Sequence, residues 1–255
     1  MIDCHCHLEQ EDYDSDRNEV IKKCKSRLKA VITCCADPRD WETTKEIIEK
    51  NKNFIFAIAG IHPEFIKDFE KGEIKEFIEI IKKEAKRGNI KAIGEIGLDY
   101  WWIKETVLRE KQKELFIKFI EISKELDLPL VVHSRDAVLE CISILEEHGM
   151  KNKKVLMHLM GDKDFVQKII SNGWMISVGP GILKSKETRK IARDCPLSNL
   201  MLETDSPWFG MGERGTPLNV FKTAEKVAEI KKISIGEVEK VTDENAIAFF
   251  SLPKI

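Results

Sequence analysis

His5 and His7 form a His-x-His pair close to the start of the sequence. Side chains on a β-strand alternate between its two faces, so this pattern predicts Asp3, His5 and His7 on one face. Cys4 and Cys6 are then expected on the other face. Two imidazoles that share a face can chelate a transition-metal ion. A His-x-His pair alone is weak evidence for a metal site, so its meaning depends on which other ligands converge on it.

Further potential metal ligands lie at or just beyond the ends of short apolar runs: His62, Glu95, His133, His158 and Asp205. A single histidine is more often a hydrogen-bonded core or capping residue than a ligand. Five of the six histidines share this placement, however, which favours one common site. The sixth, His148, precedes Gly149 at the end of a helical stretch, where a cation suits the helix dipole, and we interpret it as structural.

The elements that must position these residues are apolar runs alternating with amphipathic stretches. The apolar runs predict strands at residues 1–6, 30–35, 54–61, 92–96, 130–133, 155–158, 174–178 and 200–203. The amphipathic stretches predict helices at residues 16–28, 37–50, 73–87, 106–126, 136–148, 162–172, 185–193 and 220–231, followed by two short helices at 235–242 and 244–250.

This strict alternation predicts a parallel sheet. Eight β-then-α units in 255 residues favour a single (β/α)8 TIM barrel, one domain spanning residues 1–255, over an open doubly wound sheet. The active site of such a barrel lies at the C-terminal ends of its strands. Every candidate ligand falls at one of these ends, and closure of the barrel would bring them all into one mouth.

Six side chains are too many for one catalytic zinc ion, which uses three protein ligands and keeps an open position: His5, His7, Glu95, His133, His158 and Asp205. They suit two divalent cations about 3.5–4 Å apart. Glu95 has two carboxylate oxygens and lies between Gly94 and Gly97, where other groups can approach the backbone, so it is the expected bridge. Imidazole and carboxylate ligands favour Zn²⁺, Mn²⁺, Co²⁺ or Fe²⁺ over Mg²⁺. No cysteine is expected as a ligand, because Cys4 and Cys6 should point away from the histidines.

Composition limits the function classes. The net charge is −2, so no general positive field draws the protein to nucleic acid. No run of about 18 apolar residues occurs, and the first residues lack the apolar stretch of a signal peptide, which predicts a cytoplasmic protein without membrane contact. Seven scattered cysteines indicate buried free thiols rather than a disulfide framework. Nothing in the sequence indicates a protein partner.

The sequence resembles the TatD family of metal-dependent hydrolases along its whole length. The matching segments are Asp3-Cys4-His5-Cys6-His7, Gly60-Ile61-His62-Pro63, Ile93-Gly94-Glu95-Ile96-Gly97-Leu98-Asp99-Tyr100, Val132-His133-Ser134-Arg135-Asp136-Ala137, Met157-His158, Glu203-Thr204-Asp205-Ser206-Pro207 and Asn245-Ala246. The resemblance implies a TIM barrel, two divalent metals and phosphodiester hydrolysis, often of DNA. Two segments depart from the family pattern, Leu159-Met160-Gly161 after His158 and Arg214-Gly215-Thr216-Pro217 after strand eight. Both are expected in the mouth, where they bear on substrate preference.

We expect His5, His7, Glu95 and Asp205 to hold one ion, and Glu95, His133 and His158 to hold the other. A hydroxide activated by both ions would attack phosphorus. Asp205 would exchange a proton with the nucleophile, and Glu95 and His62 complete the expected catalytic set. His62 is expected to contact a phosphate or the leaving group rather than to serve only a structural role.

Two arginines and four aromatic residues are also expected to bind substrate. Arg135 and Arg214 can clamp phosphate oxygens, although an ion pair of Arg135 with Asp99 or Asp136 is an equal alternative. Trp101 and Trp102 can stack unpaired bases, together with the aromatic residues of the segment after strand eight, Trp208 and Phe209. The alternative is that these aromatic rings are core residues beneath helices.

These features predict a deoxyribonuclease, 3′–5′ exonuclease-like, that acts on single-stranded or frayed DNA. A second possibility is a hydrolase of an ester or amide bond, such as a deacylase, because a two-metal hydroxide also attacks carbonyl carbon. A third, a non-catalytic metal-binding protein, is disfavoured by the six intact ligand positions.

Overall fold

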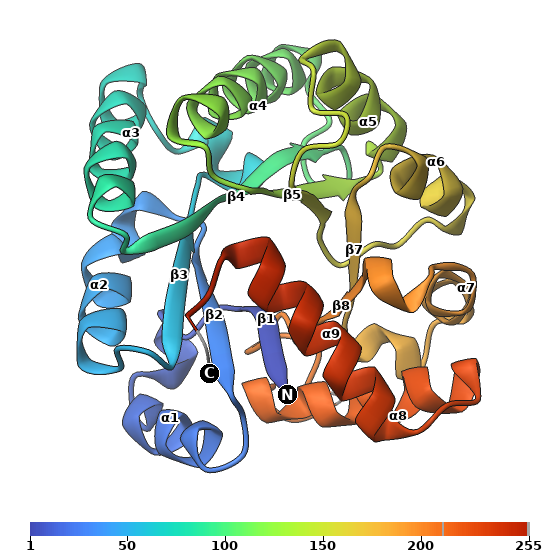
Figure 1. The fold of residues 1–255 in the computed structure, drawn as a ribbon. Coiled ribbons are helices and arrows are strands. Elements are labelled where there is room, and N and C mark those ends of the chain that lie inside the picture. Colours follow the sequence, from blue (N-terminus) through green and yellow to red (C-terminus); the bar gives the residue numbers. More distant parts are fainter. Residues whose placement is uncertain (211, 254–255) are drawn as a thin grey trace.

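The fold is an eight-stranded parallel barrel surrounded by helices, which confirms the predicted TIM barrel (Figure 1). The computed structural model describes residues 1–210 and 212–253. Its strands are β1 (Ile2–Cys6), β2 (Ala30–Cys35), β3 (Ile55–Ala59), β4 (Ile90–Asp99), β5 (Leu130–Arg135), β6 (Val155–Met157), β7 (Met175–Val178) and β8 (Leu200–Leu202). Each strand pairs in parallel with the next one in sequence. The chain that follows β8 then bonds back to β1, through Asp205 N to His5 O (3.0 Å) and His7 N to Ser206 O (2.7 Å).

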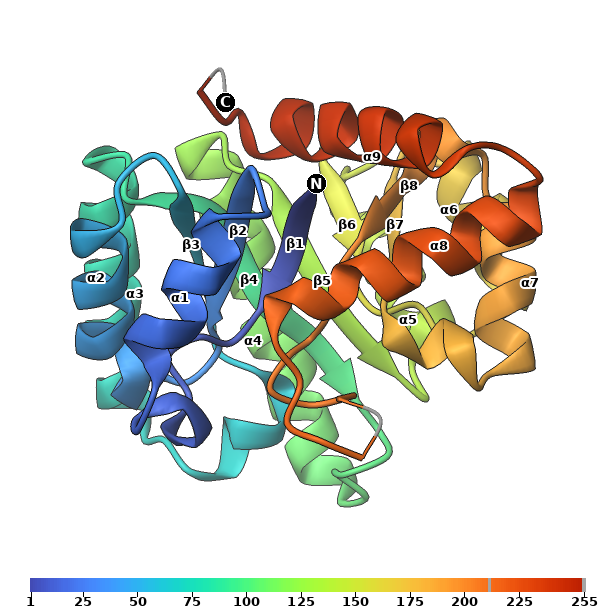
Figure 2. The same cartoon turned by 90° about the horizontal axis from the view of Figure 1, so that it is seen from below.

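The helices form the outer layer of the barrel (Figures 1 and 2). They are α1 (Arg17–Lys25), α2 (Trp41–Lys50), α3 (Lys71–Lys86), α4 (Thr106–Leu126), α5 (Val138–Glu147), α6 (Val166–Ser171), α7 (Lys186–Asp194), α8 (Val220–Lys231) and α9 (Ile235–Phe250). Within residues 1–210 and 212–253, no helix combines the length and the apolar character that a bilayer span needs.

The core has two layers, because the strands are apolar on both faces. On β2, Ala30, Ile32 and Cys34 belong to a cluster inside the barrel, whereas Val31 and Cys35 belong to the cluster between strands and helices. Parallel strands that are covered on both faces are apolar throughout, which explains why the strand sequences are continuous apolar runs and do not alternate with polar residues.

The C-terminal segment is one continuous helix, α9, so the prediction of two short helices at 235–242 and 244–250 was wrong. The acidic residue Asp243 does not interrupt the helix, because its carboxylate accepts a hydrogen bond from the backbone of Ile2 (2.7 Å). Figure 2 shows α9 lying across the end of the barrel where the strands begin. Phe249 and Phe250 join the interior cluster there, so α9 closes the end opposite the mouth.

Asn245 fastens α9 to the barrel, since its Nδ2 donates to Leu197 O (2.9 Å) and Leu200 O (2.8 Å). Replacing Asn245 by Ala is expected to lower the free energy of unfolding by about 1–3 kcal/mol, because two carbonyls lose their donor. The melting temperature, measured by calorimetry, would fall by roughly 2–10 °C. The exposed neighbour Glu244 serves as the control. If Glu244→Ala costs as much as Asn245→Ala, the fastening role is refuted.

Strand β1 does not alternate as the sequence pattern predicted. Its register on β2 shifts between Asp3 and Cys6, where Cys4 and His5 intervene. Cys4 consequently belongs to the interior cluster and only Cys6 to the helix-facing one, so the shared outward face predicted for the two cysteines was wrong. Asp3 lies level with the helix-facing residue Val31 and therefore does not share a face with His5.

Candidate metal centre

The C-terminal ends of the strands open into a cavity of about 1990 Å³. Five of the six predicted metal ligands line it, and His62 lies beside them: His7, His62, Glu95, His133, His158 and Asp205. The sixth ligand, His5, is fully buried beneath them. The barrel thus brings together, at one end, residues from six separate strand ends.

Glu95 stands at the centre of this group. Its Oε2 lies 3.5 Å from His5 Nε2 and 3.9 Å from His7 Nε2. Its Oε1 lies 2.8 Å from His133 Nδ1 and 3.2 Å from His158 Nε2. One carboxylate therefore faces two separate pairs of imidazoles, one pair with each oxygen.

The backbone around Glu95 is tightly enclosed, which explains the flanking glycines. A Cβ atom on Gly94 would lie 2.7 Å from the Cβ atom of Val131. A Cβ atom on Gly97, where φ is +139°, would lie 2.0 Å from His133 O. Only glycine permits this approach of β4 to β5, and the approach sets Glu95 beside His133.

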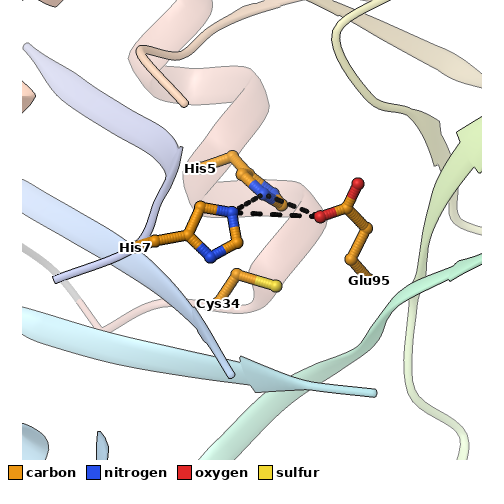
Figure 3. Close-up of side chains that lie close together, drawn as sticks. All are labelled: His5, His7, Cys34 and Glu95. Carbon is orange, nitrogen blue, oxygen red and sulfur yellow. Dashed lines mark hydrogen bonds and ion pairs between the residues drawn. The ribbon is translucent and has the colours of Figure 1, made fainter. Parts of the chain in front are cut away.

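The pair formed by His5 and His7 has the spacing of ligands that share an ion. Their Nε2 atoms are 3.2 Å apart, and Asp205 Oδ1 lies 3.3 Å from His7 Nε2 and 3.7 Å from His5 Nε2. Two nitrogens bound tetrahedrally to one zinc ion at about 2.0–2.1 Å would be about 3.3–3.4 Å apart. Figure 3 shows both imidazoles turned toward Glu95, with the thiol of Cys34 beside them.

A buried carboxylate stands behind each of three imidazoles. Glu9 Oε1 lies 3.0 Å from His7 Nδ1, Asp99 Oδ2 lies 2.9 Å from His133 Nε2, and Glu203 Oε2 lies 2.9 Å from His158 Nδ1. Such carboxylates fix the orientation of a ligand ring and raise its basicity. The sequence reading assigned none of the three. The spacing of Glu9, two residues after His7, could have indicated it.

Asp3, on the same strand as His5 and His7, does not support a ligand imidazole as these three carboxylates do. Its carboxylate instead accepts hydrogen bonds from Thr204 N (3.0 Å) and Thr204 Oγ1 (2.6 Å). Asp3 therefore holds the backbone next to Asp205 rather than an imidazole ring.

The donor set fits divalent cations. Five buried carboxylates surround the imidazoles, and within the described ranges every ion-pair partner they have is a histidine: Glu9, Glu95, Asp99, Glu203 and Asp205. Burial lowers the pKa of His7, but the carboxylates of Asp205 and Glu9 outweigh it and raise that pKa to about 10. The pKa of His133 is raised to about 9, because Asp99 and Glu95 likewise outweigh burial. Excess negative charge of this kind suits positive ions between the imidazoles.

His62 is the exception among these histidines. Burial and the neighbouring His133 lower its pKa to about 3, so the ring is neutral near pH 7. Its Nδ1 accepts a hydrogen bond from Glu64 N (3.2 Å). A neutral imidazole that accepts at Nδ1 carries its proton on Nε2, and Nε2 faces the site, 3.7 Å from Glu95 Oε1. His62 is thus a hydrogen-bond donor at the mouth.

A family model described as "TatD related DNase" matches residues 2–251. The chain belongs to the TatD-related DNase family. It is 32% identical to human "Deoxyribonuclease TATDN3" over all of this chain and 95% of that protein. It is 31% identical to the "Uncharacterized metal-dependent hydrolase YabD" of Bacillus subtilis over 99% of each chain. The crystal structure of a TatD family hydrolase from Entamoeba histolytica superposes with a TM-score of 0.89, at 22% identity, over 98% of this chain and 97% of that one.

An aromatic loop follows β4 in this TatD chain. Trp101 and Trp102 are 49% and 56% exposed, so the alternative that they are core residues is wrong. The guanidinium of Arg135 lies 5.1 Å and 5.7 Å from their ring centres. Among the described residues Arg135 forms no ion pair with Asp99 or Asp136, so its charge faces the cavity that it lines.

The loop after β8 supplies a second aromatic group. Trp208 and Phe209 are 47% and 46% exposed and line the cavity, and the ring of Trp208 lies 4.8 Å from that of His7. Of the two segments that depart from the TatD pattern, Leu159-Met160-Gly161 lines the cavity, as expected, whereas residues 214–217 do not.

Arg214 does not line the cavity, contrary to the prediction that it clamps phosphate. Its guanidinium forms a bidentate ion pair with Asp16 (2.8 and 2.6 Å) and lies 4.7 Å from the ring centre of Tyr13. Arg214 therefore ties the loop after β8 to the segment that leads into α1. Arg214 is therefore not one of the residues proposed to bind substrate.

Replacing Glu9 by Gln in this TatD chain is expected to weaken metal binding by about 10–100-fold, because His7 loses the negative charge behind it. The substitution keeps the side-chain shape, and an amide can still bond His7 and Thr33. Calorimetric titration with Zn²⁺ measures the effect. The matched control is Glu11→Gln, at an exposed site two residues away. Equal affinities for the two variants would contradict this role of Glu9.

Proposed function

We propose that this protein is a divalent-metal-dependent deoxyribonuclease that acts on single-stranded or frayed DNA ends with 3′–5′ polarity. The observation that carries the proposal is the carboxylate of Glu95, which turns one oxygen to His5 and His7 and the other to His133 and His158. The name of the human relative, a deoxyribonuclease, supports a DNA substrate.

His5, His7, Glu95 and Asp205 would hold one cation, and Glu95, His133 and His158 the other. Zn²⁺, Mn²⁺, Co²⁺ and Fe²⁺ suit these donors better than Mg²⁺. Two such ions, when bound, would supply a nucleophile at neutral pH and would neutralise charge on a phosphodiester.

The protein's own groups then handle protons and orientation. Asp205 faces the cavity, and although burial raises its pKa, the hydrogen bond from His7 and the nearby His158 bring that pKa below the usual value. Asp205 is therefore ionised near pH 7 and can take a proton from an attacking water. His62 lines the same cavity with its Nε2–H 3.3 Å from His133 Nδ1, and this group could donate to a phosphate oxygen or to the leaving group.

The charges around the mouth favour a strand end over a duplex. Arg135 and Trp102 line the cavity, and Trp101 lies beside Arg135 outside its lining, so the three could contact one phosphate and two unstacked bases at the entrance. The cavity wall along α4 and α5 carries Glu110, Glu114, Glu140 and Glu147 against one cation, Lys113, which pairs with Glu110 and Glu140, so the wall keeps a net negative charge. A rigid duplex laid across the mouth would bring its phosphates against these carboxylates, whereas a flexible end avoids them.

A panel of substrates tests the function. Protein reconstituted with Zn²⁺, Mn²⁺, Co²⁺, Fe²⁺ or Mg²⁺ is offered end-labelled single-stranded DNA, RNA, closed circular duplex DNA, and aminoacyl ester and amide substrates. We expect stepwise shortening of single-stranded DNA from the 3′ end and little cleavage of the closed circle. Cleavage of the amide or ester substrates without cleavage of DNA would overturn the proposal. Equal rates on the closed circle and the linear strand would overturn entry by an end.

A further inference from the structure

Cys34 adds a sulfur atom to the His5 and His7 side of the metal centre. One ligand atom each from His5, His7, Cys34 and Glu95 lies within 4.8 Å of the other three, and all four residues are buried. Figure 3 shows the thiol beside the two imidazoles and Glu95. The sequence predicted no thiol here, because Cys4 and Cys6 were expected to point away from the histidines.

The distances allow a shared ion. Zinc binds thiolate at about 2.3 Å and imidazole nitrogen at about 2.0–2.1 Å, so a sulfur and a nitrogen bound to one tetrahedral ion are about 3.6 Å apart. The four ligand atoms lie within 4.8 Å of one another, so rotation of the side chains can bring them to this spacing.

The position of Cys34 on the strand explains its place in the site. Ala30, Ile32 and Cys34 face the barrel interior, and Cys34 is the last of the three on β2. Ala36, two residues further, already lines the cavity. Cys34 thus forms the floor of the mouth, one interior level below open space.

The thiol of Cys34 is also not committed elsewhere. The thiols of Cys6, Cys35, Cys141 and Cys195 each donate to a backbone carbonyl. Within residues 1–210 and 212–253, the thiol of Cys34 donates no hydrogen bond. The thiols of Cys4 and Cys24 donate none either, but neither residue belongs to a group of possible metal ligands.

The two sides of Glu95 differ in what stands behind their imidazoles. His133 and His158 each have a carboxylate against the ring nitrogen that points away from Glu95. Of the other pair, His5 and His7, only His7 has such a carboxylate. His5 Nδ1 is buried without a hydrogen-bond partner among the described residues. Of these four imidazoles, His5 is therefore the one whose second nitrogen has no supporting carboxylate, although Glu95 and Asp205 both face its Nε2.

We propose that Cys34 is a ligand of the cation held by His5 and His7, and that its sulfur makes this position prefer softer ions. On binding, the thiol gives its proton to solvent and its sulfur lone pair to the ion. Zn²⁺, Co²⁺ and Fe²⁺ then gain over Mn²⁺ and Mg²⁺, which favour oxygen ligands. This inference rests on the proposed metal site but not on the identity of the substrate.

X-ray absorption and optical spectra test the proposal. Zinc-loaded protein is expected to show a sulfur neighbour at about 2.3 Å, and cobalt-loaded protein a sulfur-to-cobalt charge-transfer band in the near ultraviolet. Both signals should vanish in Cys34→Ala and persist in Cys35→Ala, the adjacent and equally buried thiol on the other face of β2. Zinc affinity should fall about tenfold or more in Cys34→Ala, with Mn²⁺ affinity nearly unchanged.

Absence of the sulfur neighbour in the native protein would overturn the proposal without any variant. If the Cys34→Ala variant fails to fold, the Cys34→Ser variant replaces it, because serine is close to cysteine in size. Retention of the sulfur signals in the serine variant would likewise overturn the proposal. Nuclease assays on the same samples separate the two proposals. A sulfur signal without DNA cleavage refutes the proposed function alone, and cleavage without a sulfur signal refutes the role of Cys34 alone.

Discussion

Replacing Glu95 by Gln is expected to lower kcat on single-stranded DNA by about a thousandfold or more, equivalent to roughly 4 kcal/mol of transition-state stabilisation. The amide keeps the shape of the side chain, but it has only one oxygen and no charge to offer the two imidazole pairs. Elemental analysis should find two ions per native chain and at most one in Glu95→Gln. The loss of metal and of activity would then follow from the missing shared ligand rather than from unfolding.

The control for this experiment is Glu114→Gln, which removes a carboxylate from the wall of the same cavity on α4. It should retain both ions and near-native turnover. Undiminished activity in Glu95→Gln would refute the two-metal mechanism. A native chain that holds only one ion at saturation would refute the bridging role.

Replacing both Trp101 and Trp102 by Ala is expected to raise KM on strands of several nucleotides by about 10–100-fold, with little change in kcat. Base stacking on an aromatic side chain contributes roughly 1–3 kcal/mol per base, and both rings are exposed beside Arg135. The loop itself should persist, because Asp99 holds it through backbone N–H groups that alanine retains. Steady-state kinetics on a series of strand lengths measures the effect.

Two comparisons make this test specific. A dinucleotide too short to reach the loop should show the same KM with either protein. A double Phe variant should recover most of the affinity, because it keeps aromatic faces. An equal loss on the shortest and the longest substrates would mean that the rings support the site rather than bind bases.

The barrel and the gathering of the metal-ligand residues could be predicted because both follow from order along the chain. Each apolar run is short, each is followed by a helix, and the ends of parallel strands must share one side. His133 and His158 therefore reach Glu95 without any knowledge of side-chain packing.

Other features depend on information that spacing does not contain. Strands covered on both faces are apolar throughout, so the sequence does not show that Cys34 faces inward and Cys35 outward. The register shift in β1 puts Cys6 on the helix-facing side while Cys4 faces the interior with Ile2, and no local residue pattern marks this shift. Arg214 was misplaced because its partner, Asp16, lies about two hundred residues away in sequence and meets it only through the fold.

Asp99 connects the metal centre to the aromatic loop after β4. Its Oδ1 accepts the backbone N–H groups of Trp101 (2.9 Å) and Trp102 (2.7 Å), while its Oδ2 lies 2.9 Å from His133 Nε2. Any movement of His133 as an ion enters or leaves is passed through one carboxylate to two solvent-exposed indoles. The intrinsic fluorescence of the protein should therefore report metal occupancy directly, so that loading can be followed in solution with neither DNA nor a dye present.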